Sequence, residues 1–125
     1  MLKHIVISAI VMLLLDGIYL STFSNFFNDV VNRVQGSRIK FKISGAVLCY
    51  IFLIGGLYYF IINQQKSVKD AFILGLVIYG VYETTTYTLF DKWSPKAMLI
   101  DTLWGGILFA LTTALTYKIV KKITY

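Results

Sequence analysis

The chain has 125 residues, of which 58% are hydrophobic and only 14% are charged. Soluble domains carry about a quarter charged residues, and one of this size cannot bury so much apolar surface, so the composition excludes an ordinary soluble fold and indicates helices in a lipid bilayer. The net charge is +6, but the basic residues lie between or beside apolar runs, so we expect anionic lipid headgroups as partners and no nucleic acid.

Four apolar segments are long enough to cross a bilayer as helices, which takes about 20 residues each. In chain order they cover residues 5–27, 43–62, 71–90 and 97–117. The second carries no charged residue, whereas each of the others carries one acid. The first segment has an alternative interpretation as a cleaved signal peptide, because Lys3 and His4 resemble a short basic leader. We favour a retained helix, because Asp16 directly follows the apolar run and no small-x-small cleavage site comes after it.

The first two spans are joined by an amphipathic segment at about 28–42. Apolar side chains such as Val30 and Val34 share one helical face, whereas polar residues such as Asp29 lie mostly on the other. The basic residues expected at lipid headgroups are Arg33, Arg38, Lys40 and Lys42. We expect this segment to lie in the headgroup region of the membrane. The alternative is a solvated connector.

The other two connections are short, and Pro95 suits the first turn of the last helix. Short connections make consecutive helices antiparallel, so the predicted fold is all-α: an integral membrane four-helix bundle with up-down-up-down order, forming a single domain over residues 1–125. In this topology six basic residues lie on each side of the membrane, so the positive-inside rule does not decide the orientation. The free amino terminus favours cytoplasmic termini.

Three acids lie within the predicted spans, Asp16, Glu83 and Asp101, and no lysine or arginine lies at matching depth. Acids in a bilayer are costly and are by default candidates for a functional site. At 1.5 Å per residue, Glu83 lies about 10 Å before the end of its span and Asp101 about 8 Å after the start of the next. Asp16 reaches the same depth if the first span ends near Phe23. We therefore expect the three acids to face one polar pocket.

Hydrogen-bond donors accompany the acids at helical spacing. They are Tyr19 on the first helix, Tyr79, Tyr82 and Thr86 on the third, and Trp104 on the fourth. Hydroxyl groups and an indole N–H can donate to carboxylates. One interpretation is functional: the acids bind a cation, relay protons or hold a small polar ligand. The other is structural: neutral or hydrogen-bonded acids brace the helices against one another.

The sequence holds no motif for catalysis or for a cofactor. His4 is the only histidine and lies near the membrane surface, where no Ser-His-Asp arrangement can be assembled. Cys49 is the only cysteine, and acids without His or Cys ligands make no specific metal signature. We therefore expect no cofactor and no metal, and a lipid-modifying enzyme is the weakest hypothesis. Small residues suited to close helix packing, or to a homo-oligomer, are Gly105, Gly106, Ala110 and Ala114.

Several motifs resemble a family of small four-helix membrane proteins, domain of unknown function 2177 (DUF2177). That family has an aspartate and then an aromatic residue near the end of its first helix; here these are Asp16 and Tyr19, with tyrosine where tryptophan is usual. Its tyrosine-rich third helix carries an Asp-Leu-Thr-Asn motif, which is similar to Glu83-Thr84-Thr85-Thr86. The turn Trp93-Ser94-Pro95 and the run Asp101-Thr102-Leu103-Trp104-Gly105 also match the family.

The resemblance covers nearly the whole chain. It implies the four-helix fold and the importance of Asp16, Glu83 and Asp101, but no reaction. Family members occur mainly in bacteria, with relatives in some large DNA viruses, which implies a bacterial inner membrane or a viral internal membrane. Two main hypotheses follow: a carboxylate-lined pocket for a cation, proton or small polar ligand, and a structural membrane component whose acids only brace the bundle.

Overall fold

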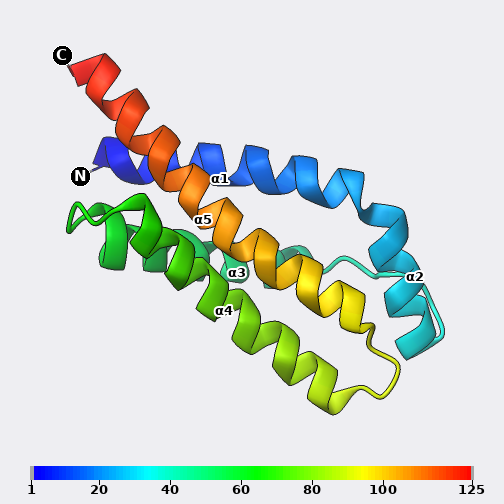
Figure 1. Ribbon diagram of the computed structural model, residues 1–125. Helices are drawn as coiled ribbons and strands as arrows, with labels where there is room; N and C mark the ends of the chain where they lie inside the picture. The colour runs from blue at the N-terminus through cyan, green and yellow to red at the C-terminus, as the bar shows by residue number, and fades with distance from the viewer. Residues whose placement is uncertain (1, 125) are drawn as a thin grey trace.

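The computed structural model describes residues 2–124, which fold into helices with no strand among them. In chain order the α-helices are α1 (Leu2–Thr22), α2 (Ser24–Gln35), α3 (Ile43–Leu57), α4 (Val68–Leu89) and α5 (Pro95–Thr124). Helix α3 continues directly into a π-helical turn, η1 (Tyr58–Ile62). Figure 1 shows α4 and α5 side by side, with α1 along another side of α5. The start of α1 and the end of α5 lie at one end of the molecule, and α2 lies at the other.

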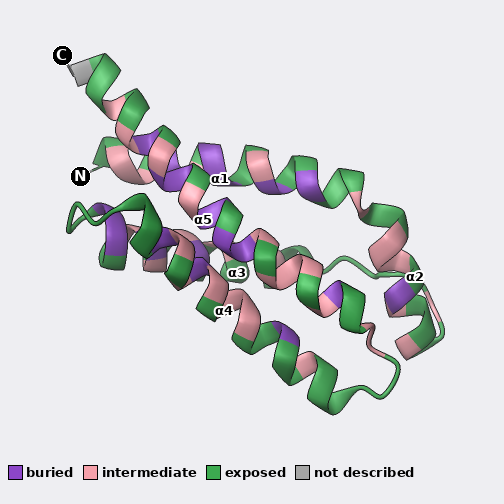
Figure 2. Cartoon of the chain, in the orientation of Figure 1, coloured by how far each residue is buried: buried purple, intermediate pink, exposed green. Residues whose placement is uncertain are grey.

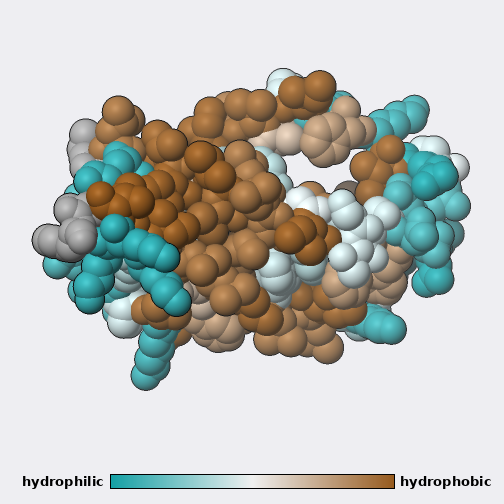
Figure 3. Space-filling model, turned by 90° about the horizontal axis from the view of Figure 1, so that it is seen from above, coloured by the Kyte–Doolittle hydropathy of each residue, from teal (hydrophilic) through white to brown (hydrophobic). Residues whose placement is uncertain are grey.

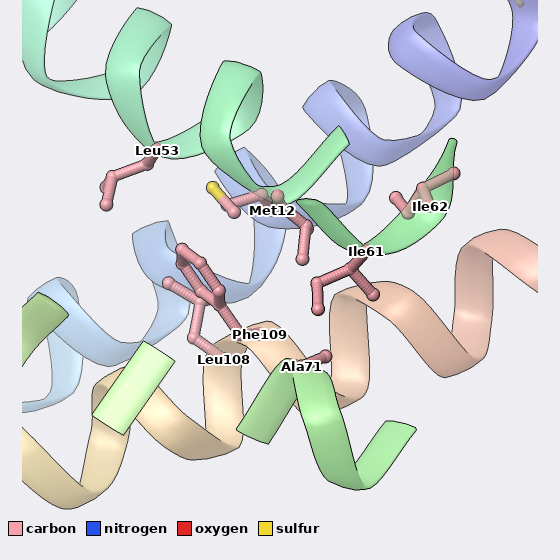
Figure 4. Packing of buried hydrophobic residues seen from close by; sticks show 8 residues of the cluster. Met12, Leu53, Ile61, Ile62, Ala71, Leu108 and Phe109 are labelled. Carbon is pink, nitrogen blue, oxygen red and sulfur yellow. The ribbon is translucent and has the colours of Figure 1, made fainter. Parts of the chain in front are cut away.

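Side chains from α1, α3, η1, α4 and α5 meet in one hydrophobic core (Figure 4). Its buried members are Met12, Leu53, Leu57, Ile61, Ile62, Ala71, Leu108 and Phe109. Figure 2 shows the outward sides of the helices largely exposed, and many side chains there are large and apolar. In Figure 3 the apolar side chains cover the middle of the molecule and the hydrophilic ones gather at its two ends. This distribution matches a hydrocarbon layer between two polar interfaces.

The tightest helix contact joins α4 to α5 and depends on glycines. A Cβ atom at Gly75 would collide with the backbone oxygen of Gly105 and with the ring of Phe109. A Cβ atom at Gly105 would collide with the ring of Tyr79, and one at Gly106 would meet the ring of Phe72. The predicted packing residues Gly105 and Gly106 are therefore buried against α4; Ala110 and Ala114 are half-buried further along α5.

The predicted end of the first span was wrong. The span was expected to reach residue 27, but α1 ends at Thr22 and α2 begins at Ser24. The ring of Tyr19 packs against those of Phe23 and Phe27, with centroids 5.1 and 6.0 Å apart. The N–H groups of Phe23 and Phe27 still donate to backbone oxygens four residues earlier. The chain can therefore bend without losing these backbone hydrogen bonds, and the aromatic rings pack onto α1.

The segment predicted to be amphipathic, residues 28–42, is helical only in its first part. Helix α2 ends at Gln35, where Gly36 takes a left-handed conformation with φ of 76°. Such a residue commonly ends a helix, because glycine adopts positive φ without a Cβ penalty. The following chain folds back on α2, since the N–H of Ile39 donates to Asn28 Oδ1 at 3.2 Å. The basic residues predicted at headgroups are all exposed here: Arg33, Arg38, Lys40 and Lys42.

Three helical stretches in the described chain are long and apolar enough to cross a membrane: Leu2–Thr22, Ile43–Ile62 and Pro95–Ile123. The predicted span at 71–90 corresponds to α4, which is 22 residues long but is not among the three. Its last two turns carry Glu83 and several threonines, which lower its mean hydropathy. Length and composition thus support three of the four predicted spans. The last helix begins at Pro95, as expected, but continues past residue 117 to Thr124.

Candidate functional site

Asp16 is buried and accepts hydrogen bonds from two other helices. The indole N–H of Trp104, on α5, donates to Asp16 Oδ1 at 2.9 Å. The hydroxyl of Tyr50, on α3, donates to Asp16 Oδ2. Both donors are neutral groups that satisfy the carboxyl oxygens without an ion pair. One acid in the last two turns of α1 therefore joins three helices.

Tyr19 lies one turn further along α1 and connects Asp101 to the Trp104 indole that donates to Asp16. Its hydroxyl donates to Asp101 Oδ1, on α5, at 3.0 Å. Its ring stacks on the indole of Trp104, with centroids 4.6 Å apart and planes 4° from parallel. Because the rings are stacked, Tyr19 and Trp104 hold each other in place while they donate to Asp101 and Asp16.

Glu83 completes the arrangement from α4. Its side chain is only 1% exposed, and it accepts a hydrogen bond from the indole N–H of Trp93 at 3.0 Å. Trp93 lies in the turn between α4 and α5. The carboxyl groups of Glu83 and Asp101 also lie within hydrogen-bonding reach of each other. We call the seven side chains of this arrangement the carboxyl network: Asp16, Tyr19, Tyr50, Glu83, Trp93, Asp101 and Trp104.

The carboxyl network contains no basic side chain, and its hydrogen-bond donors are tyrosines and tryptophans. No group of three or more His, Cys, Asp and Glu side chains within residues 2–124 is arranged to hold a metal ion. A cavity of about 400 Å³ lies beside the network between α1 and α5. It is bordered by Tyr19 and Trp104, but apart from Thr22 its other lining side chains are apolar. The acids thus bond to one another and to neutral donors rather than lining an open polar cavity.

The remaining residues predicted for the pocket lie outside the network. Tyr79 packs against the hydrophobic core and against Gly105. Tyr82 is 59% exposed. The hydroxyl of Thr86 donates to the backbone oxygen of Tyr82 at 2.8 Å, within its own helix. The residues of α4 that share the predicted face therefore have different surroundings. Tyr79 faces the core, Tyr82 faces the outer surface, and only Glu83 belongs to the carboxyl network.

Sequence reasoning missed two members of the network, Tyr50 and Trp93. Tyr50 lies in a span without acids, and its contact with Asp16 joins residues 34 positions apart. Only the packing of α3 against α1 brings them together. Trp93 was predicted only as part of the turn before the last helix, but it lies ten residues after Glu83, and the turn folds back so that its indole donates to the acid. The short distance in sequence between Trp93 and the intramembrane acid Glu83 could have predicted this hydrogen bond.

The comparisons with known proteins give one match, to a family model. A family model described as a predicted membrane protein, DUF2177, matches residues 1–118. No curated protein and no solved structure matches the chain. The match covers the first two membrane-crossing candidates in full, most of the third and the whole carboxyl network. The chain therefore belongs to the DUF2177 family of predicted membrane proteins.

Proposed function

We propose that this is a multi-pass membrane protein in which α4 crosses the bilayer together with α1, α3 with η1, and α5, and in which the carboxyl network binds a proton. The observation that carries the proposal is the contact between the buried carboxyl group of Glu83 and the half-buried carboxyl group of Asp101, neither of which has a basic partner among the described residues.

Helix α4 suits a bilayer better than its composition indicates. At 1.5 Å per residue its 22 residues reach about 33 Å, and the hydrocarbon core is about 30 Å thick. The hydroxyls of Thr84, Thr86 and Thr88 each donate to the backbone oxygen four residues earlier. Threonines bonded in this way expose little unsatisfied polarity to lipid. Glu83 is covered by Trp93 and Asp101 rather than by lipid.

A proton fits the Glu83–Asp101 pair better than a metal ion or a small polar ligand does. Two carboxylates in contact, one of them buried, repel each other when no cation is present, and one shared proton removes the repulsion. A divalent cation needs more oxygen ligands than this pair supplies, and it usually keeps bound waters. In addition, one oxygen of Asp101 already accepts a hydrogen bond from Tyr19, and one of Glu83 accepts from Trp93. The neighbouring cavity is apolar and offers a polar ligand little to bond to.

The structural hypothesis stays as the second candidate, because the same network joins α1 to α3 and α5. Hydrogen bonds between membrane helices contribute about 0.6 to 2 kcal/mol each. In that case the acids brace the bundle and exchange no proton. The protein would then be a structural component of its membrane.

The first prediction separates the two candidates with Glu83→Gln, Asp101→Asn and the double variant in the full chain in nanodiscs. Amides keep the shape and most of the hydrogen bonds but cannot hold the proton. We expect the wild type at neutral pH to give the infrared band of a protonated carboxyl group, and each single variant to lose it. The matched control is Asp91→Asn, since Asp91 is an exposed acid near Trp93 and its loss should leave the band unchanged.

Thermal unfolding of the same variants, with and without Na⁺, K⁺ or Ca²⁺, completes the comparison. A bound proton predicts that the wild type is indifferent to these cations. Stabilisation by one of them, lost in the variants, would indicate a cation site instead, through mass action. A wild type without a protonated band, whose amide variants differ in stability by less than about 1 kcal/mol, would favour the structural candidate.

The location of the protein is part of the same proposal. We propose a bacterial inner membrane or a viral internal membrane, with the chain termini on the cytoplasmic side. The family match supports a membrane.

A further inference from the structure

A polar cavity of about 620 Å³ lies at the end of the bundle opposite α2, where α1 begins and α5 ends. Its polar lining consists of His4, Tyr58, Asn63, Gln65, Tyr117 and Lys121. These side chains come from α1, η1, the turn after η1 and α5. None of them belongs to the carboxyl network, so the cavity is a separate feature of the molecule.

One wall of the cavity is formed by residues 58–65, whose backbone conformation is unusual. Residues 58–62 form a π-helical turn, a distortion that is rare and frequently occurs at functional sites. Gln65 follows with a positive φ of 53°, which is uncommon for a residue other than glycine. The hydroxyl of Tyr117 donates to the backbone oxygen of Lys66 at 2.7 Å, which fastens this turn to α5. The polar wall is therefore built from a fixed turn.

An apolar groove of about 500 Å³ runs between α1 and α3. Its lining includes Leu13, Val47, Ile51 and Gly55, and almost no polar atom is exposed in it. The groove and the polar cavity share one lining residue, Tyr58. The polar cavity and the apolar groove therefore adjoin each other at Tyr58.

The charges around the polar cavity complement an anion. Lys121 lines it and has no carboxylate partner among residues 2–124. Lys118 and Lys122 lie beside Lys121 in the same helix, and Lys66 lies in the turn that forms the wall. Lysines close to a membrane surface attract anionic lipid headgroups by about 1 kcal/mol each.

From these observations we propose that the polar cavity and the apolar groove together bind one anionic phospholipid. The headgroup phosphate lies in the cavity against Lys121 and His4, with the amides of Asn63 and Gln65 as hydrogen-bond donors. One acyl chain lies in the groove between α1 and α3. Tyr58 lies at the junction, where its apolar ring and polar hydroxyl suit the boundary between chain and headgroup.

The second prediction tests both parts of this site in the full-length protein, purified in a mild detergent and titrated with phosphatidylglycerol. Bound lipid is counted by native mass spectrometry. Lys121→Gln should weaken phosphatidylglycerol binding about fivefold, since one lysine near a headgroup contributes that much. The control Lys92→Gln changes an exposed lysine in the turn between α4 and α5, which lies outside the cavity lining, and should bind as the wild type does.

The groove is tested by Gly55→Leu, which places a side chain in it. A Cβ atom at Gly55 or at Gly56 meets nothing within 4 Å, so neither substitution is expected to disturb the fold, and a melting curve checks this. Because Gly55 lines the groove and Gly56 does not, Gly55→Leu should weaken binding about tenfold, the equivalent of about two buried methylene groups. Gly56→Leu should leave it unchanged.

Phosphatidylcholine and inorganic phosphate serve as the comparison ligands. Equal binding of phosphatidylcholine, or unchanged binding by both Lys121→Gln and Gly55→Leu, would overturn the proposal. Displacement of phosphatidylglycerol by inorganic phosphate with equal strength in the wild type and in Gly55→Leu would overturn it too, because the cavity would then bind a free anion without a chain in the groove.

Discussion

At Asp16, donors from two different helices meet a single carboxyl group. The indole of Trp104 and the hydroxyl of Tyr50 take one oxygen each. An acid in the same place without them would face the cost of a bare polar group in lipid, because no water is available to replace the bonds. The neutral donors therefore decide whether the acid is tolerated in α1.

The third prediction removes one of these donors by Tyr50→Phe. The ring and its packing stay, but Asp16 loses a bond that joins α1 to α3, so the free energy of unfolding should fall by about 0.6 to 2 kcal/mol. Chemical denaturation in detergent measures the change. The control is Tyr59→Phe in η1, because Tyr59 is 61% exposed and its loss should cost less than about 0.5 kcal/mol. Equal effects of the two substitutions would show that the bond to Asp16 contributes nothing.

Among the elements, the helix ends were predictable where a local signal marks them. Pro95 marked the start of α5, because proline has a fixed φ and no N–H to lose in the first turn. The end of α1 carried no such signal, since Phe23 and Phe27 look like the continuation of an apolar span. The rings of both residues pack against Tyr19, but nothing in their spacing marks the end of α1 at Thr22.

In the candidate site, too, some residues could be predicted from local sequence signals and others could not. Depth along the helices predicted that Glu83 and Asp101 lie on one side of the membrane, and the structure brings their carboxyl groups together. Spacing alone also selected Tyr82, which is exposed, because helical periodicity gives a shared face but not the direction in which that face points. The role of Tyr50 could not be predicted, because no local sequence rule shows that α3 packs against α1.

The fourth prediction concerns the contact between α4 and α5. Gly105→Ala adds a Cβ atom that collides with the ring of Tyr79, and an added methyl group in a tight interface costs about 1 to 3 kcal/mol. The melting temperature should therefore fall. In the control Gly17→Ala the added atom meets nothing within 4 Å, so higher helix propensity should leave α1 unchanged or slightly more stable. A Gly105→Ala variant as stable as this control would mean that α4 and α5 pack less closely than described.

At the scale of the whole molecule, the two ends of the bundle carry different chemistry. The Glu83–Asp101 pair and Trp93 lie towards α2 and the turn between α4 and α5, and Figure 3 shows a hollow towards that end. The polar cavity with Lys121 lies at the other end. Between them runs the apolar band of the outer surface. The proposed proton-binding pair and the proposed lipid site would thus give one small molecule two tasks at opposite ends. Both proposals depend on how many helices cross the bilayer.

The fifth prediction tests whether α4 crosses the membrane. Single cysteines are placed at Ser37, Gln64 and Asp91 in a Cys49→Ala background, which removes the exposed native thiol. These positions lie in the three connections between the long helices; Ser67 and Ser94 are avoided because their hydroxyls cap α4 and α5. If all four helices cross, an impermeant maleimide should label Ser37→Cys and Asp91→Cys from one side of sealed vesicles and Gln64→Cys from the other. A molecule with only the three spans that composition supports would leave α4 on the surface, and Gln64→Cys and Asp91→Cys would then label from the same side. That result would exclude the four-span topology and require Glu83 to meet Asp101 at the membrane surface, where water and salt would screen the two carboxylates from each other.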